Sequence, residues 1–157
     1  MGKSRKRYPN GLAVQHVSTY LVRETSAATS EYVTDPADAA RVLREAFDLD
    51  HRDREIFAAI ALNTKNRVLG VYEVSVGSLN ASIVHPRELF KTAVMLSASS
   101  VVVGHNHPSG DTTPSGADIQ LTRRLVKAGD VLGIEVLDHV IVSHDGTQAS
   151  LRDAGLM

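Results

Sequence analysis

A short apolar run that leads directly into two histidines constrains the fold of this chain most strongly. The run 101–103 is all valine, and His105 and His107 follow it at once. Side chains alternate between the two faces of a strand, so a buried strand here sends both imidazoles to the same side of its end. A loop rich in Pro, Gly, Ser and Thr follows, and a helical pattern opens at 115–118. The stretch predicts a strand–loop–helix unit that presents polar side chains at one end of a sheet.

The residue types in this stretch can hold a metal ion. Two imidazoles on one face can share a metal at about 2.0–2.1 Å, and Asp118 can supply a third ligand. Three protein ligands leave a fourth position for water, which is typical of catalytic sites. Asp111 is the rival third ligand, because a tight turn can return it to His107. The pattern favours Asp118, which a helix would hold rigidly.

Ser115 and Asp118 also match a helix capping box, a purely structural motif. Taken alone, that spacing favours the capping role. With two histidines upstream, Asp118 can serve both roles, since an acidic side chain at a helix N-terminus also gains from the helix dipole.

Composition limits the classes of protein that this chain can belong to. At 157 residues it is long enough for one domain with a real core, and 43% hydrophobic and 22% charged residues are ordinary for a soluble protein. The net charge of −1 gives no global case for a nucleic-acid or membrane partner. There is no cysteine, so a zinc site here must use histidine and carboxylate. The sequence has no membrane-length apolar run and no signal-peptide core, which leads us to expect a cytoplasmic protein.

The order of patterns predicts a single α/β domain. We expect a disordered basic tail at 1–12, which can touch nucleic acid but is better explained as a solubilising terminus, and one domain at 13–157. Strands are predicted at 13–22, 56–62, 67–76, 99–104, 134–143 and 148–151. Helices are predicted from 36 to about 49, from about 86 to 96 and from 115 to about 132, with Leu89, Phe90, Ala93, Val94 and Leu96 on the buried side of the second. The expected fold is a mostly antiparallel or mixed sheet with layered helices, and Gly129 in the last helix has no explanation from sequence.

Zinc hydrolysis also needs a general base for the bound water, and three glutamates are candidates. Glu55 precedes a strand of seven apolar residues, where partial desolvation can raise its pKa. Glu73 lies within a hairpin strand. Glu88 lies in the first turn of a helix, where a favourable interaction with the helix dipole is enough to account for an acidic residue. Among the other histidines, His139 follows Asp138 in a strand, and a structural role is favoured over support of the site.

The spacing of the candidate ligands resembles the zinc signature of the JAMM (JAB1/MPN+) metallopeptidases. That signature is His-x-His, seven residues, Ser, two residues and Asp, which here falls on His105, His107, Ser115 and Asp118. Those enzymes typically have Ser or Thr between the histidines, whereas this chain has Asn106. Three features look instead like the RadC branch of the superfamily, over about 35–157: the run His-Asn-His-Pro-Ser-Gly at 105–110, Pro-Ser-x-x-Asp at 114–118 and Leu-Asp-His at 137–139.

The resemblance implies a fold, a zinc ion and roles for two further residues. It implies the cytidine-deaminase-like architecture of the JAB/MPN domain, with a mixed sheet flanked by helices. The general base of such enzymes precedes a strand upstream of the histidines, which matches Glu55 best. Ser115 would donate a hydrogen bond that steadies the tetrahedral intermediate. RadC-like proteins also carry an N-terminal helix-hairpin-helix region, for which too few residues precede the domain here.

Three functions follow as hypotheses. The leading one is a zinc-dependent hydrolase that cleaves a peptide or isopeptide bond of a protein substrate with a metal-activated water. The alternative is a RadC-type module associated with DNA repair and nucleic acid, without proteolytic turnover. A metal-stabilised interaction module is the third. Sheet edges at 13–22 and 148–151 further predict a homodimer.

Overall fold

The computed structural model describes residues 32–77 and 84–157. The basic tail predicted at 1–12 and the strand predicted at 13–22 lie outside the described residues. The domain boundary at residue 13 therefore stays a prediction.

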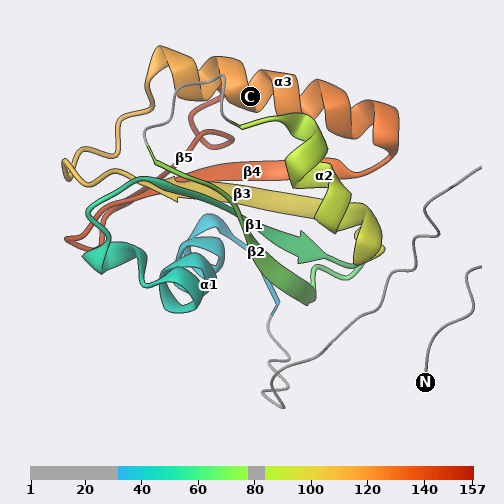
Figure 1. The fold of residues 1–157 in the computed structure, drawn as a ribbon, viewed down its shortest axis with the longest axis horizontal. Helices are drawn as coiled ribbons and strands as arrows, with labels where there is room; N and C mark the ends of the chain where they lie inside the picture. The colour runs from blue at the N-terminus through green and yellow to red at the C-terminus, as the bar shows by residue number, and fades with distance from the viewer. Residues whose placement is uncertain (1–31, 78–83) are drawn as a thin grey trace, which may run out of the picture.

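Helices and strands are interspersed along the described chain, as the sequence patterns predict (Figure 1). In chain order they are α1 (Pro36–Phe47), a 3₁₀ turn (Leu49–His51), β1 (Ile56–Leu62), β2 (Val68–Val76), α2 (Pro86–Met95), β3 (Ser100–Asn106), α3 (Gly116–Leu132), β4 (Glu135–Val142) and β5 (Gln148–Ser150).

The five strands form one mixed sheet in the order β2-β1-β3-β4-β5. β1 runs antiparallel to both β2 and β3, β3 runs parallel to β4, and β5 runs antiparallel to β4. The prediction of a single α/β domain with a mixed sheet is confirmed. β5 is an edge strand, as predicted, and the homodimer expected from such edges stays a prediction.

Helices cover both faces of the sheet (Figure 1). One core cluster joins α1 to Ala58 and Ile60 of β1, and the other joins α2 and α3 to Phe57 and Ala59. Successive residues of β1 thus point to opposite cores, and every residue of β1 and β3 is buried. Burial on both faces explains why these strands read as continuous apolar runs rather than as alternating ones.

Residues at its two ends determine the bounds of α1, which ends earlier than predicted. Asp35 caps its N-terminus by accepting a hydrogen bond from the Asp38 amide, and Pro36 occupies the first turn. The helix ends at Phe47, because Asp48 adopts a left-handed conformation and a 3₁₀ turn replaces the end predicted near residue 49. A left-handed residue breaks the helical hydrogen-bond ladder, and Asp tolerates that conformation better than most residues do.

Two further predictions on element bounds and burial are corrected. Val94 was placed on the buried side of α2, but it is 57% exposed, since the helix turns it away from the sheet. β3 does not stop at Gly104 but continues through Asn106, pairing with both β1 and β4. His105 is therefore part of a central strand rather than of a loop.

Gly129 allows α3 to lie close to the start of β4. A Cβ atom at this position would stand 2.4 Å from the Ile134 carbonyl oxygen and 3.3 Å from the ring of Phe90. Any larger residue would push the helix away from the backbone beneath it. Within the described ranges, no helix has the length and hydropathy needed to cross a membrane.

Candidate metal centre

His105 is held at the end of β3 by neighbours on both sides. It lies opposite Phe57 in the β1–β3 pair, and the two rings stack with centroids 6.0 Å apart. His105 is fully buried, and burial, with the neighbouring charge of His107, lowers its pKa to about 3. The ring is therefore a neutral imidazole, the form that ligates metals.

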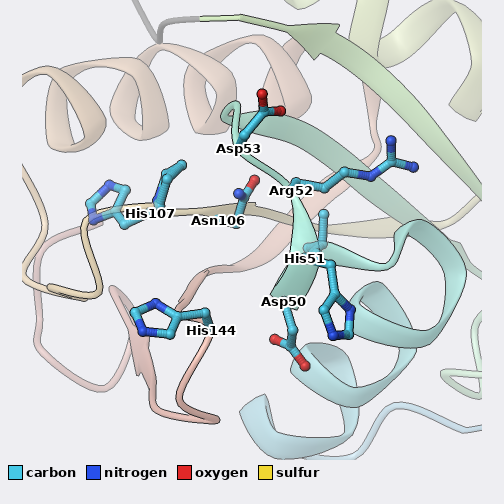
Figure 2. Close-up of a pocket in the computed structure, with 9 residues that line it drawn as sticks. Asp50, His51, Arg52, Asp53, Asn106, His107 and His144 are labelled. Carbon is cyan, nitrogen blue, oxygen red and sulfur yellow. The ribbon is translucent and has the colours of Figure 1, made fainter.

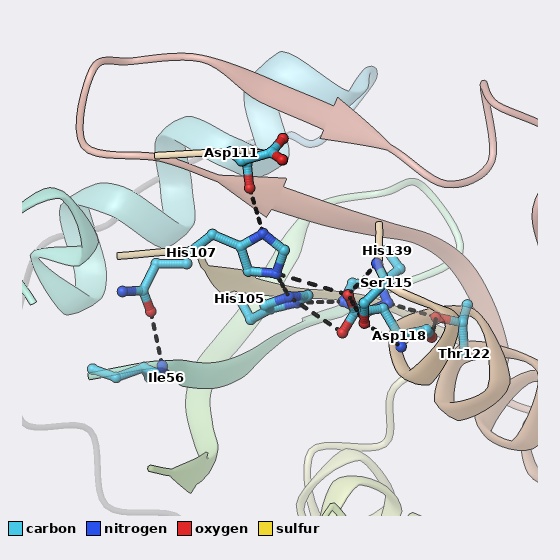
Figure 3. Close-up of polar contacts among 9 residues, drawn as sticks. Ile56, His105, His107, Asp111, Ser115, Asp118, Thr122 and His139 are labelled. Carbon is cyan, nitrogen blue, oxygen red and sulfur yellow. Dashed lines mark hydrogen bonds and ion pairs between the residues drawn. The ribbon is translucent and has the colours of Figure 1, made fainter. Parts of the chain in front are cut away.

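His107 lies just beyond the strand, and its backbone still follows β4. Its amide donates to the Val142 carbonyl oxygen at 2.9 Å, and its ring Nδ1 donates to the Asp111 carbonyl oxygen at 2.5 Å. Because a carbonyl oxygen only accepts, this bond fixes the proton on Nδ1. The other nitrogen, Nε2, faces His105 (Figure 3).

Asp118 completes a cluster that could hold a metal ion, as the spacing predicts. The two Nε2 atoms of His105 and His107 are 2.8 Å apart, and the Asp118 oxygens lie 3.5 Å and 3.7 Å from them. Two bonds of about 2.0–2.2 Å at a tetrahedral angle place ligand atoms roughly 3.3–3.6 Å apart. The donor set thus fits a tetrahedral ion once the imidazoles separate slightly.

Asp118 takes part in the capping box and the ligand cluster at the same time. Its Oδ2 accepts from the Ser115 amide at 2.8 Å and from the Ser115 hydroxyl at 2.6 Å, while its own amide donates to the Ser115 hydroxyl. Oδ1 is the oxygen closer to His105. One motif at the start of α3 therefore orients the carboxylate and places the Ser115 hydroxyl beside it.

Asp111, the rival ligand, contributes its backbone to the cluster. Its carboxylate is exposed and accepts from the Thr113 amide and hydroxyl, hydrogen bonds that lower its pKa. Among the described residues, the group of potential metal ligands contains Asp118 and not Asp111. The carbonyl oxygen of Asp111 instead orients the ring of His107.

His139 and Thr122 form a buried contact behind His105. His139 Nε2 lies 2.8 Å from His105 Nδ1, and the Thr122 hydroxyl lies 2.6 Å from His139 Nδ1. Burial lowers the pKa of His139 well below its usual range. The sequence favours a structural role for His139 over support of the site, and the contact of its ring with His105 corrects that expectation. For Thr122 the sequence holds no signal beyond its position four residues after Asp118.

Asn106, which stands between the two histidines, fixes the chain around Glu55. Its side-chain oxygen accepts from the Ile56 amide at 2.8 Å, and its side-chain nitrogen donates to the Arg54 carbonyl oxygen at 3.0 Å. Both peptide groups that flank Glu55 are thus bound by one buried side chain. Glu55 directly precedes β1, at the end of the sheet where Phe57 pairs with His105.

The other two glutamates lie elsewhere. Glu73 pairs with Ala58, whose side chain packs in the α1 core, so Glu73 projects from the face of the sheet opposite to His105. Glu88 is exposed in the first turn of α2 and forms an ion pair with Arg87. Neither belongs to the ligand cluster.

Comparison with known proteins agrees with this geometry. A family model described as "RadC-like JAB domain" matches residues 33–156. The chain belongs to this family. Its relatives include UPF0758 proteins of Moorella thermoacetica, 52% identical over 80% of this chain, and of Desulforudis audaxviator, 53% identical over 79%. The chain spans about half the length of these relatives, 53% of each.

Two adjoining hollows border the cluster in this RadC-like JAB domain. The first, of about 380 Å³, lies between residues 49–53 and residues 106–108, and His144 also lines it (Figure 2). The second, of about 490 Å³, is lined by Glu55, Gly77 and Ser109. Both are lined by Asp53 and Pro108, and His107 is the member of the cluster that lines the first.

Among the described residues, the remaining histidines are not part of the cluster. His51 is exposed and bound to Asp48, whose hydrogen bond raises the pKa of its ring. His85 occupies the N-cap position of α2, and His144 lies in an exposed turn. His16 lies outside the described residues.

Proposed function

We propose that this chain is a zinc-dependent hydrolase that cleaves a peptide or isopeptide bond with a metal-activated water. The observation that carries the proposal is the group formed by buried His105 and Asp118 with half-buried His107, three ligand atoms within 4.8 Å of one another. Two histidines and one carboxylate are the donor set of many catalytic zinc sites, in which a fourth position stays open. Membership of the RadC-like JAB domain family supports the same reading.

Beside the metal ligands, two residues of the chain have roles in the reaction, Glu55 and Ser115. A bound Zn²⁺ would supply Lewis acidity and lower the pKa of a water molecule at the open position. Glu55 would act as a general base toward the attacking water and then as a general acid toward the leaving amine. The Ser115 hydroxyl, which donates to Asp118 Oδ2 in the structure, would redirect its single proton to the substrate oxygen on which negative charge develops.

Strand geometry supports Glu55 as the base. Phe57 lies opposite His105 in an antiparallel pair, so Glu55 and His107 each lie two residues further along on facing segments. Alternation directs both side chains to the face on which His105 lies. Asn106 holds the peptide groups on either side of Glu55, which restricts where its carboxylate can go.

The test measures zinc content and hydrolysis together. Glu55→Gln keeps the size of the side chain and removes the proton acceptor, so hydrolysis of a panel of peptide and isopeptide substrates should fall by roughly 10²–10⁴-fold with zinc retained. Glu73→Gln, on the opposite face, is the matched control and should keep wild-type turnover. Full activity in Glu55→Gln would contradict the assignment of the base, and a wild-type protein that loads zinc but cleaves no amide would contradict the hydrolase itself.

A further inference from the structure

A chain of hydrogen bonds connects two of the candidate ligands behind the metal centre. It starts at Nδ1 of His105, passes through His139 and the Thr122 hydroxyl, and returns to the Asp118 carbonyl oxygen, with separations of 2.8, 2.6 and 2.6 Å (Figure 3). His105, His139 and Thr122 are each completely buried. Water does not reach the chain, so these residues are the partners on which each polar atom depends.

The donors and acceptors of this chain fit together in one direction when His105 holds a metal. A ligating Nε2 carries no proton, so the neutral ring of His105 carries its proton on Nδ1 and donates it to His139 Nε2. His139 then carries its own proton on Nδ1 and donates it to the Thr122 hydroxyl. The hydroxyl proton goes to the Asp118 carbonyl oxygen, which only accepts. The hydroxyl accepts one hydrogen bond and donates one, each ring nitrogen along the chain has one partner, and no proton is left over.

We propose that Thr122 and His139 act as a positioning relay that sets the tautomer and the ring orientation of His105 for metal binding. The proposal rests on the metal-binding part of the proposed function and assigns two positioning residues to it. Metal-ligating histidines usually donate their second N–H to a carboxylate, a carbonyl or water. Here the acceptor is a second imidazole, and a threonine one helical turn after Asp118 anchors it.

The packing around His139 explains how the relay stays in place. Its ring meets Phe57 edge-on at 5.3 Å, while Phe57 also stacks on His105. The same aromatic ring therefore limits the rotation of both imidazoles. Asp138, the neighbour of His139, accepts from the backbone amides of His139 and Arg152 and from the Ser150 hydroxyl, which fixes the strand rather than the ring.

Two variants of Thr122 separate the relay from simple packing. Thr122→Val keeps the shape of the side chain and removes the hydroxyl, whereas Thr122→Ser keeps the hydroxyl and removes a methyl group. Zinc affinity is measured by competition with a chromophoric chelator, on protein whose metal-free fold is checked by thermal unfolding. Loss of a partner behind a ligand typically weakens metal binding 10–100-fold. We expect a loss of about that size in Thr122→Val, and near wild-type affinity in Thr122→Ser.

Nitrogen NMR of the histidine rings in the zinc-loaded wild-type protein supplies a second, independent readout. The relay requires both His105 and His139 to carry their proton on Nδ1. Wild-type zinc affinity in Thr122→Val, or a His139 ring protonated on Nε2 alone, would overturn the relay while leaving the zinc site intact. A wild-type protein that binds no zinc would remove the proposed function and the relay together.

Discussion

At the scale of single residues, the two nitrogens of His107 show how the backbone prepares this site. Nδ1 is engaged by the Asp111 carbonyl oxygen, so Nε2 is directed toward His105 and Asp118. The contribution of Asp111 comes from a peptide group that every residue has. The loop conformation, rather than the acidic side chain, is what His107 needs.

This assignment predicts opposite outcomes for the two aspartates. Asp111→Ala retains the carbonyl oxygen and should leave zinc affinity roughly unchanged. Asp118→Ala removes a ligand and should weaken binding by more than the roughly 10–100-fold typical of a partner behind a ligand. Chelator competition on both variants measures the difference. The reverse pattern, with zinc lost only in Asp111→Ala, would show that the third ligand is misassigned.

At the scale of elements, α3 must approach the start of β4 closely, and Gly129 makes this approach feasible. Alanine normally stabilises a helix interior by about 1 kcal/mol relative to glycine. At position 129 its Cβ would lie 2.4 Å from the Ile134 carbonyl oxygen, a backbone atom that cannot move aside cheaply. The steric cost should therefore outweigh the gain in helix propensity.

Gly129→Ala should accordingly lower the free energy of unfolding by about 1–3 kcal/mol, the usual cost of overpacking. Urea denaturation at neutral pH measures it. Gly116→Ala, at the first turn of the same helix, is the control, because its Cβ would meet nothing within 4 Å. A gain in stability for Gly129→Ala would mean that helix and strand are not in contact there.

The sequence predicts features within an element better than contacts between elements. The bounds of β1, the N-terminus of α3 and the cluster of His105, His107 and Asp118 followed from local patterns, because alternation, capping and spacing are local properties. The place of His139 did not, since it depends on which strand runs beside β3 and in which register. Gly129 was unexplained for the same reason: its partner is a carbonyl group in the next element.

At the scale of the whole molecule, the buried imidazoles tie stability to pH. Burial lowers the pKa of both His105 and His139, so the unfolded chain takes up protons below its ordinary histidine pKa of 6.5 while the folded chain does not. The free energy of unfolding is therefore highest above pH 6.5, where both rings are neutral in either state. It falls as the pH drops from 6.5 toward the lower pKa of the folded state, because protons bind the unfolded chain preferentially. Each histidine contributes at most about 1.4 kcal/mol per pH unit, the limit reached when the unfolded ring is fully protonated and the folded ring is neutral.

Chelator-treated protein should therefore lose roughly 3 kcal/mol or less of unfolding free energy per pH unit between pH 6.5 and 5. Urea denaturation across this range measures the slope. His139→Gln removes one of the two buried imidazoles and should reduce the slope to about half. Burial raises the pKa of Asp138, so proton uptake by this carboxylate in the folded state increases the free energy of unfolding as the pH falls. The measurement stops at pH 5 to limit this opposing contribution. A flat profile would contradict neutral buried histidines.

The central claim is that His105, His107 and Asp118 hold one zinc ion, and metal analysis of the purified protein tests it most directly. The protein is expressed without a metal-affinity tag, dialysed and analysed for all first-row transition metals, beside a His107→Ala variant prepared in the same way. We expect about one zinc per chain in the wild type and a near-complete loss in His107→Ala. Zinc absent from the wild type, or retained equally by the variant, would contradict the claim.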